Sequence, residues 1–295
     1  MEIEIKELER QNTWDITNLP YNRIALKGKW VYKIKTDLNG HIIKYKARWV
    51  VKGFNQVLGL DYLDTFSTTC RPESYRIIFI IAMQNSWDLD QYDVKNAFVH
   101  ASIDKEIYVE LPIGLEGNYN NNYKGEPLNK RYKPNNSNIN TRKVCKLNKA
   151  LYGLKQSPRL WYKHLLSILK DLSFITLPYD EAIFIHKEYS IIIICHVDDL
   201  IITGPNKDKI KDIITSLSKL IKIEYIGKLH QFLGMEFKLD YKNKGIYINQ
   251  IKYLKGLLVK FNKDKLTPIS TPIELGIQLY KNEEQANKED ISQFQ

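Results

Sequence analysis

Residues 190–203 read Ser-Ile-Ile-Ile-Ile-Cys-His-Val-Asp-Asp-Leu-Ile-Ile-Thr, two runs of β-prone residues on either side of an acidic pair. The flanking runs are apolar enough to be buried, and carboxylates beside buried strands are costly unless their charge is compensated. A tight hairpin would put Asp198 and Asp199 at its tip, where divalent cations would relieve their repulsion. The alternative is that the pair forms only the polar turn of the hairpin.

A further carboxylate ends a short strand predicted at residues 89–93. Two Mg²⁺ ions a few ångströms apart need carboxylates from separate chain segments, and phosphoryl transfer uses such a pair of ions. Asp93 is therefore a candidate partner of the acidic pair. It is equally suited to cap a helix, and spacing alone does not separate it from Asp88 and Asp90.

Residues 30–52 are predicted to form a β-hairpin, because apolar and basic residues alternate along both halves. The turn signal between the halves consists of Asp37, Asn39 and Gly40. The predicted apolar face of the hairpin holds Trp30, Tyr32, Ile34, Ile43, Tyr45, Ala47, Trp49 and Val51. The opposite face is a basic stripe that includes Lys44, Lys46, Arg48 and Lys52.

The rest of the chain mixes helical and strand patterns. Helical periodicity predicts helices at residues 72–84, 157–169, 210–217 and 251–261, and Ser157 is expected to cap the second of them. Strands are predicted at residues 108–111, 231–239 and 245–249. Residues 114–140 are dense in Asn, Gly and Pro and are expected to form a disordered surface insertion.

Composition favours a polyanionic partner. The 295 residues include 44 basic and 34 acidic side chains, and the net charge of +10 suits nucleic acid or an anionic membrane surface. The longest apolar runs are too short to span a bilayer, so no membrane segment is expected. The 3 cysteines are far apart and form no disulfide or metal-knuckle pattern, which favours a reducing, intracellular compartment.

Five blocks of the sequence belong together as a set. They are Tyr45-Lys-Ala-Arg-Trp-Val-Val-Lys-Gly-Phe54, Asp93-Val-Lys-Asn-Ala-Phe98 with Glu106-Ile-Tyr-Val-Glu-Leu-Pro112, Leu151-Tyr-Gly-Leu-Lys-Gln-Ser-Pro158 with Trp161-Tyr162, His196-Val-Asp-Asp199, and Phe232-Leu-Gly-Met235. In this order they resemble the conserved blocks of reverse transcriptases from copia-type LTR retrotransposons, over residues 14–272. A single acidic pair is a weak signal, whereas five ordered blocks are a strong one.

The resemblance implies an α+β right-hand polymerase fold. Fingers and palm would occupy residues 25–250, with the Asp198-Asp199 hairpin on an antiparallel palm sheet. Residues 1–24 would be an N-terminal extension and residues 251–295 the truncated start of a thumb or connection, leaving the thumb partial or absent. The resemblance selects Asp93 over the neighbouring aspartates and implies that Asp93 and Asp198, supported by Asp199, hold two Mg²⁺ ions. Mn²⁺ can substitute for Mg²⁺ in this role.

The resemblance also implies contacts to the incoming nucleotide. Arg48 would bind the triphosphate, and Lys46 would help or would hold template backbone. Phe98 would pack under the sugar and leave no room for a 2′-hydroxyl. The residues implied near the templating base and nucleotide are Tyr152, Gly153 and Lys155. Without the resemblance, these groups are interpreted as a solvated strand face, a core aromatic and a loop-to-helix junction.

Contacts to the primer and template are implied for two further segments. Phe232, Leu233 and Gly234 would grip the primer strand, although they also suit an ordinary strand with a bend. His196 stands where the family usually has Tyr, and His is smaller and titrates near neutral pH. This departure suggests weakened activity or a decaying copy.

Three functional hypotheses follow. The resemblance implies an RNA-directed DNA polymerase that extends a primer on RNA or DNA template with deoxynucleoside triphosphates, in a cytoplasmic particle or the nucleus. It implies no oligomeric state. The first alternative is a truncated, inactive remnant that only binds nucleic acid, because protease, integrase and RNase H signatures are missing. The second is a membrane-surface or protein-interaction module, but no sustained basic amphipathic helix supports it.

Overall fold

A computed structural model describes residues 1–36, 41–115 and 142–263, together with residues 265, 267, 270, 273, 276–278 and 292. The chain forms two compact units, Met1–Ile248 and Asn249–Gln295. The predicted turn at residues 37–40 and most of the predicted insertion lie outside the described residues. Within the described part of the chain, no helix combines the length and the apolar character that crossing a bilayer requires.

The first unit is built on an antiparallel six-stranded sheet with the strand order β11-β4-β10-β9-β8-β7. The apolar runs around the acidic pair form β9 and β10, which lie in the middle of this sheet. The strands are β4 (Asp90–Val94), β7 (Phe174–Leu177), β8 (Asp180–His186), β9 (Ile192–His196), β10 (Asp199–Thr203) and β11 (Ile223–Lys228).

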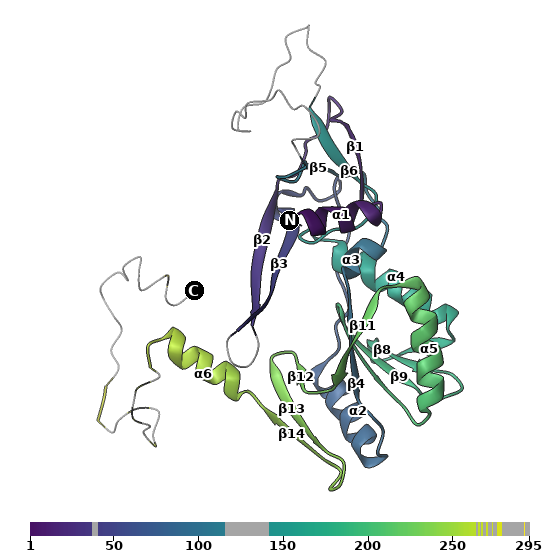
Figure 1. Cartoon of the computed structure of the whole chain (residues 1–295), viewed down its shortest axis with the longest axis vertical. Coiled ribbons are helices and arrows are strands. Elements are labelled where there is room, and N and C mark those ends of the chain that lie inside the picture. The colour runs from purple at the N-terminus through teal and green to yellow at the C-terminus, as the bar shows by residue number, and fades with distance from the viewer. Residues whose placement is uncertain are drawn as a thin grey trace. The chain divides into compact units, whose positions relative to one another are not determined.

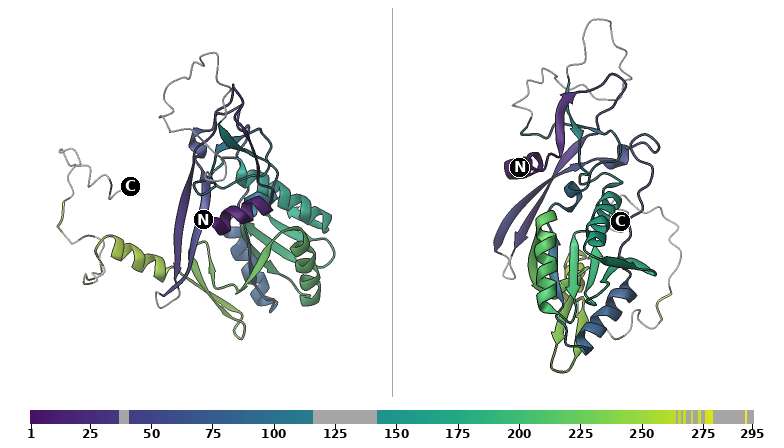
Figure 2. Two further views of the ribbon diagram at one scale, coloured as in Figure 1. Left: turned by 45° about the horizontal axis from the view of Figure 1, so that its top comes forward. Right: turned by 90° about the vertical axis from the view of Figure 1, so that its right-hand side faces the viewer.

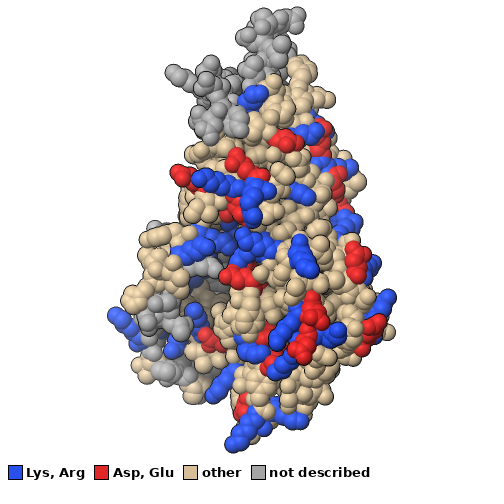
Figure 3. Space-filling view, turned by 45° about the vertical axis from the view of Figure 1, so that its right-hand side comes forward, with Lys and Arg blue, Asp and Glu red and all other residues tan. Residues whose placement is uncertain are grey.

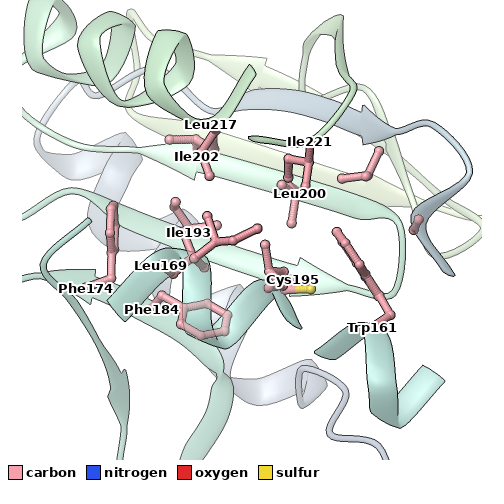
Figure 4. Close-up of a cluster of buried hydrophobic side chains, with 14 of the residues drawn as sticks. Trp161, Leu169, Phe174, Phe184, Ile193, Cys195, Leu200, Ile202, Leu217 and Ile221 are labelled. Atoms are coloured by element: carbon pink, nitrogen blue, oxygen red, sulfur yellow. The ribbon is translucent and has the colours of Figure 1, made fainter. Parts of the chain in front are cut away.

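Helices cover both faces of this sheet (Figure 1). On one face, Leu200 and Ile202 pack with side chains of α4 (Ser157–Asp171) and α5 (Lys207–Leu220), as Figure 4 shows. On the other face, Ile194 and Ile201 pack with α2 (Pro72–Gln84). Neighbouring residues of a strand point to opposite faces, so the same short strands supply both layers. Each fully buried Leu or Ile contributes roughly 1.5–3 kcal/mol.

The first unit has a second hydrophobic core, to which its N-terminal segment and the base of the hairpin contribute. Ile5 and Leu8 of α1 (Glu2–Arg10) and Trp14 of β1 (Trp14–Asn18) are buried there together with Trp49. β1 belongs to a three-stranded sheet with the order β1-β6-β5, formed with β6 (Lys143–Leu147) and β5 (Tyr108–Glu110). Residues 1–24, expected above to be an N-terminal extension, thus hold a helix and a strand that pack into this core.

The predicted hairpin is confirmed as β2 (Gly28–Thr36) paired with β3 (Ile42–Val51). Figures 1 and 2 show it as a long two-stranded ribbon. Only its base is packed: Trp49 is 3% exposed, whereas Tyr45 is 73% exposed. The apolar face expected from the alternation is therefore buried at the base and open to solvent further out.

The predicted helix at residues 157–169 is confirmed as α4, but the prediction that Ser157 caps it is wrong. Gln156 is the residue that precedes the first turn, and no side chain caps the helix. The Ser157 hydroxyl instead donates to the carbonyl of Leu151 at 2.6 Å and accepts from the Leu151 amide at 3.1 Å. The Ser157 side chain therefore holds together the loop at residues 151–156 and does not cap the helix.

The predicted strand at residues 231–239 is interrupted. It forms β12 (Gln231–Phe232) and β13 (Met235–Asp240), and β14 (Gly245–Asn249) completes a small sheet. Leu233 and Gly234, with φ values of 51° and 76°, make the turn between β12 and β13. Positive φ at both central residues is typical of a two-residue type I′ hairpin turn.

Among the described residues, short helical segments complete the first unit, and the second unit contains one longer helix. The short segments are η1 (Gly53–Asn55) and α3 (Ala97–His100). In the second unit, α6 (Ile251–Lys260) confirms the helix predicted at residues 251–261, and none of its residues is buried.

The base of the hairpin is fixed by a glycine. Gly153 has a φ of +93°, and a Cβ at this position would overlap the carbonyl oxygen of Val51 and a methyl of Val50. The neighbouring Tyr152 carbonyl accepts a hydrogen bond from the Val51 amide at 2.8 Å. The loop before α4 can therefore lie against β3 only if residue 153 has no side chain.

Gly153→Ala is expected to lower the free energy of unfolding by at least about 2 kcal/mol, from left-handed strain and overlap together. Gly59→Ala is the matched control, because Gly59 has a φ of +85° but nothing within 4 Å of an added Cβ. That control should cost only about 1 kcal/mol. Urea denaturation measures both, and equal losses would contradict the packing argument.

Candidate functional site

Four polar side chains form a row across one face of the six-stranded sheet. Asp93 on β4 is the direct partner of Asp199 on β10, which in turn pairs with His196 on β9. On the other side, Glu224 of β11 pairs with Asp93. Directly opposed residues of antiparallel strands share a face, so Glu224, Asp93, Asp199 and His196 lie side by side.

Asp198 lies in the turn that joins β9 to β10, next to this row. Val197, with a φ of 57°, and Asp198 form the turn, and the Trp161 indole donates to the Val197 carbonyl at 2.6 Å. The Asp198 carbonyl accepts from the Val94 amide at 2.8 Å. These bonds hold the turn against the end of β4, so the backbone of Asp198 lies beside that of Asp93.

The two competing aspartates have other partners. Asp88 forms ion pairs with Lys207 at 2.6 Å and with Lys228 at 3.1 Å. Asp90 accepts from Lys228 at 2.8 Å and from the Tyr225 hydroxyl at 3.0 Å. Asp90 also lies at the other end of β4, opposite Ile202. Of the three aspartates that spacing could not separate, only Asp93 faces the acidic pair.

Asp93, Asp198 and Asp199 form an acidic cluster in which the negative charges repel one another. Burial, followed by the charges of Asp198 and Asp93, raises the pKa of Asp199 to about 6 against the opposing effect of a hydrogen bond from Gln91. Burial lowers the pKa of His196, which the Asp198 charge opposes. A cation at this position would relieve the repulsion that raises the pKa of Asp199.

A cleft of about 300 Å³ joins the carboxylates to the basic face of the hairpin. Asp93 and Asp199 line it from the sheet, and Lys33, Lys46 and Arg48 line it from β2 and β3. On the face drawn in Figure 3, basic and acidic side chains are interspersed. The cleft thus sets two anionic groups opposite three cationic ones, an arrangement suited to a bound metal and a phosphate.

Arg48 lines the cleft and also contacts the first of two neighbouring aromatic rings. Its guanidinium lies over the ring of Tyr152, 5.2 Å from the centroid, and the Tyr152 ring meets Phe98 edge to face at 4.6 Å. Phe98 is only 8% exposed and belongs to the core. Nε of Arg48 is buried without a hydrogen-bond partner. Burial raises the pKa of Tyr152 to about 12, so this phenol stays neutral.

Lys155 is engaged elsewhere. Its ammonium donates to the Tyr62 hydroxyl at 3.2 Å and lies over the Tyr62 ring, and its amide donates to Gln56. The side chains that line the cleft do not include Lys155. Gly153, the neighbour of Tyr152, approaches the backbone of Val51, so the close contact it permits is made within the protein.

Residues 232–234 were predicted to grip the primer. They contact the row of four polar side chains, called here the acidic row, through one pair of rings. Phe232 is 1% exposed and packs edge to face against His196, with centroids 6.1 Å apart. Leu233 is 38% exposed at the tip of the β12–β13 turn. His230 and Gln231, just before Phe232, line the cleft itself.

Several residues at the site were not predicted from the sequence. Lys95 lines the cleft, and its ammonium contacts both the Asp93 and the Glu224 carboxylates. Gln91, 6% exposed, also lines the cleft, as does Lys33. The position of Lys95 two residues after Asp93 was the one available signal. Nothing in the sequence linked Glu224 to residue 93, because that contact depends on the pairing of β11 with β4.

The donor chemistry fits a hard divalent cation. Asp93, Asp198 and Asp199 offer carboxylate oxygens, the ligands that Mg²⁺ and Mn²⁺ prefer. Among the described residues, no three His, Cys, Asp or Glu side chains converge closely enough to hold a metal ion as they stand. The ammonium of Lys95 also contacts Asp93, one of these three carboxylates.

Comparison with known proteins supports the resemblance found in the sequence. The family model described as reverse transcriptase (RNA-dependent DNA polymerase) matches residues 11–133 and 131–275. The retrovirus-related Pol polyprotein from transposon TNT 1-94 of Nicotiana tabacum is 34% identical over 285 residues, 95% of this chain. The corresponding polyprotein from transposon RE1 of Arabidopsis thaliana is 33% identical over 273 residues, 92% of this chain.

These relatives are much longer than the chain, which covers 20% of the first and 17% of the second. The matched segment includes every block on which the resemblance depended. The chain therefore belongs to the reverse transcriptase (RNA-dependent DNA polymerase) family, in the branch found in the Pol polyproteins of copia-type retrotransposons.

Proposed function

We propose that the chain is the fingers and palm of an RNA-directed DNA polymerase. It would extend a primer on RNA or DNA template by adding deoxynucleotides from their triphosphates. The six-stranded sheet would be the palm, the β2–β3 hairpin would belong to the fingers, and residues 251–295 would begin the thumb or connection. The observation that carries the proposal is the pairing of Asp93 with Asp199 on one side of a cleft that Arg48 lines from the other.

Asp93 and Asp198 would be the main metal ligands and Asp199 would support them. Two Mg²⁺ ions, when bound, lower the pKa of an attacking hydroxyl and stabilise charge on a leaving phosphate. The sheet supplies rigid positions for the carboxylates, since β10 packs on both faces and β4 packs on one face through Tyr92 and Val94. The pKa of Asp199 is raised first by burial and then by the charges of Asp198 and Asp93, and the second of these causes supports the assignment because a bound cation would remove it.

The nucleotide would lie between the hairpin and the sheet. Arg48, whose Nε has no partner, would donate to the triphosphate, and Lys46 would add positive charge. Phe98 would pack under the sugar and select against a 2′-hydroxyl, with Tyr152 as its ring neighbour. The residues proposed to complete this pocket are Gly153 and Lys155, the latter after leaving Tyr62.

The primer terminus would approach from the side of β12 and β13. His196 would contact the primer or template, with its ring held by Phe232. Leu233 and Gly234 form the exposed turn of that hairpin and would contact the primer strand. The smaller His side chain at residue 196 would give a weaker contact than the Tyr usual in the family.

Asp198→Asn is expected to lower the rate of primer extension by at least about 10²-fold, because it removes a metal-binding charge at the reacting phosphate. The assay is extension of a labelled primer on RNA template with Mg²⁺. Asp212→Asn is the control, since Asp212 is an exposed residue of α5 that pairs only with Lys209 among the described residues. Template binding that persists without any synthesis by the unaltered chain would favour the nucleic-acid-binding remnant, and extension that survives Asp198→Asn would refute the mechanism.

Arg48→Ala should raise the KM for deoxynucleoside triphosphates by about tenfold or more, the loss expected for a charge-assisted hydrogen bond. Lys44→Ala is the control, because Lys44 lies on the same face of β3 but does not line the cleft. Steady-state extension with varied nucleotide concentration measures both. A similar KM for the two variants would contradict the proposed triphosphate contact.

Asp199→Asn is expected to stabilise the fold near pH 7.5 in the absence of divalent cations. The folded-state pKa of about 6 exceeds the ordinary 3.8, so the ionised group disfavours the folded state progressively as pH rises through this interval. Because the group is partly solvated, we expect a gain in Tm of only roughly 2–4 °C. Thermal unfolding should show the gain at pH 7.5 and lose it near pH 4. A gain of the same size at both values would contradict the charge argument.

A further inference from the structure

Lys95 lies between two carboxylates of the acidic row. Its ammonium forms ion pairs with Oδ2 of Asp93 and with Oε2 of Glu224. The three side chains differ in exposure: 26% for Asp93, 34% for Lys95 and 58% for Glu224. The backbone amide of Lys95 donates to the carbonyl of Lys222 at 2.8 Å, which fixes residue 95 against the start of β11.

This contact opposes cation binding at Asp93. An ammonium on a carboxylate oxygen takes the place of a metal ligand bond, and its own charge repels an incoming cation. Burial works to lower the pKa of Lys95, but its bonds to Asp93 and Glu224 outweigh burial and raise that pKa. Oδ2 of Asp93 is therefore in contact with a cationic side chain that an incoming metal ion must displace.

Glu224 offers a second position for the same ammonium. It is the direct cross-strand partner of Asp93, so the two carboxylates are neighbours on one face. The charge of Lys95 lowers the pKa of Glu224 through their hydrogen bond, so this carboxylate is ionised. Lys95 can lose Asp93 and keep Glu224 by a short movement of its flexible side chain.

We propose that Lys95 is a positioning residue that neutralises Asp93 in the free protein and gives it up when a divalent cation binds, while Glu224 retains the ammonium. The proposal rests on the proposed function, because it takes Asp93 as a metal ligand. The proposal adds that the ammonium of Lys95 competes with the divalent cation for the Asp93 carboxylate. The cation requirement of the protein is then set in part by Lys95 and Glu224, which coordinate nothing themselves.

The test is Mn²⁺ binding by the whole chain without nucleic acid, followed by the electron paramagnetic resonance signal of free Mn²⁺. Lys95→Met should tighten Mn²⁺ binding by about fivefold or more, because a competing charge is removed. Glu224→Gln should weaken it, because the ammonium then stays on Asp93. Lys95→Arg keeps the charge and should give no gain, and Lys29→Met, at an exposed lysine of β2 that does not line the cleft, is the control for loss of a lysine on the nearby hairpin.

A double variant that combines Lys95→Met with Glu224→Gln distinguishes the proposed exchange of the ammonium from a general effect of charge. If Glu224 acts through Lys95, Glu224→Gln has little effect on Mn²⁺ affinity once Lys95→Met is present, so the two effects are not additive. Additive effects would overturn the proposal, as would unchanged or weaker Mn²⁺ binding in Lys95→Met. Circular dichroism and thermal melts verify that each variant is folded.

Asp93→Asn distinguishes failure of this inference from failure of the proposed function. If Asp93→Asn loses Mn²⁺ affinity but Lys95→Met gains none, the metal site stands and the role of Lys95 is refuted. If Asp93→Asn binds Mn²⁺ as the unaltered chain does, both the proposed metal site and the role of Lys95 are refuted. Primer extension, measured separately, should need less Mg²⁺ in Lys95→Met.

Discussion

The site depends on the register between β4 and β10. This pairing sets Asp93 directly opposite Asp199, while Tyr92, Val94 and Leu200 face the core that α4 and α5 cover. A slip of one residue would turn Asp93 toward the layer that α4 and α5 cover, where Leu200 and Ile202 are 0% exposed. Burying an unpaired carboxylate there is prohibitively costly, so the apolar packing on both faces also enforces the position of the charges.

The same packing sustains the repulsion within the acidic cluster. Burial and, after it, the charges of Asp198 and Asp93 raise the pKa of Asp199, so the ionised form of this group opposes folding. The Trp161 indole, bonded to the turn carbonyl of Val197, and the Val94 amide, bonded to Asp198, fix the turn from two sides. The energy for holding the charges together thus comes from elements that take no part in chemistry.

The sequence predicted the elements whose signals are local. Alternation identified the β2–β3 hairpin, and helical periodicity identified α2 with the same bounds, residues 72–84. It did not identify α1, because Ile5 and Leu8 are isolated apolar residues in a charged segment and only the second core reveals their role. At Leu233-Gly234 the sequence indicated at most a bend within one strand, because Leu rarely adopts the positive φ that the hairpin turn imposes there.

For the site, residue types were predictable but partners were not. Motif order selected Asp93, and the strand register places it opposite Asp199. Residue spacing carried no information on Glu224, which is 131 positions from Asp93 and becomes its neighbour only because β11 adds to the sheet edge beside β4. Likewise, Lys155 belongs to a block that resembles the family, at residues 151–158. Its contact with Tyr62 was not predictable, because Tyr62 lies in a loop that precedes α2.

Unsatisfied polar groups mark the same region without reference to any motif. Among the described residues, the buried side-chain atoms without a hydrogen-bond partner are Arg48 Nε, Gln91 Oε1, His196 Nδ1 and Thr203 Oγ1. Arg48 and Gln91 line the cleft, and His196 belongs to the acidic row. Each such atom costs about 1–3 kcal/mol in the folded chain. Thr203 lies at the opposite end of β10 from Asp199, so three of the four atoms lie at or beside the cleft, and this partial overlap supports the proposed nucleotide site.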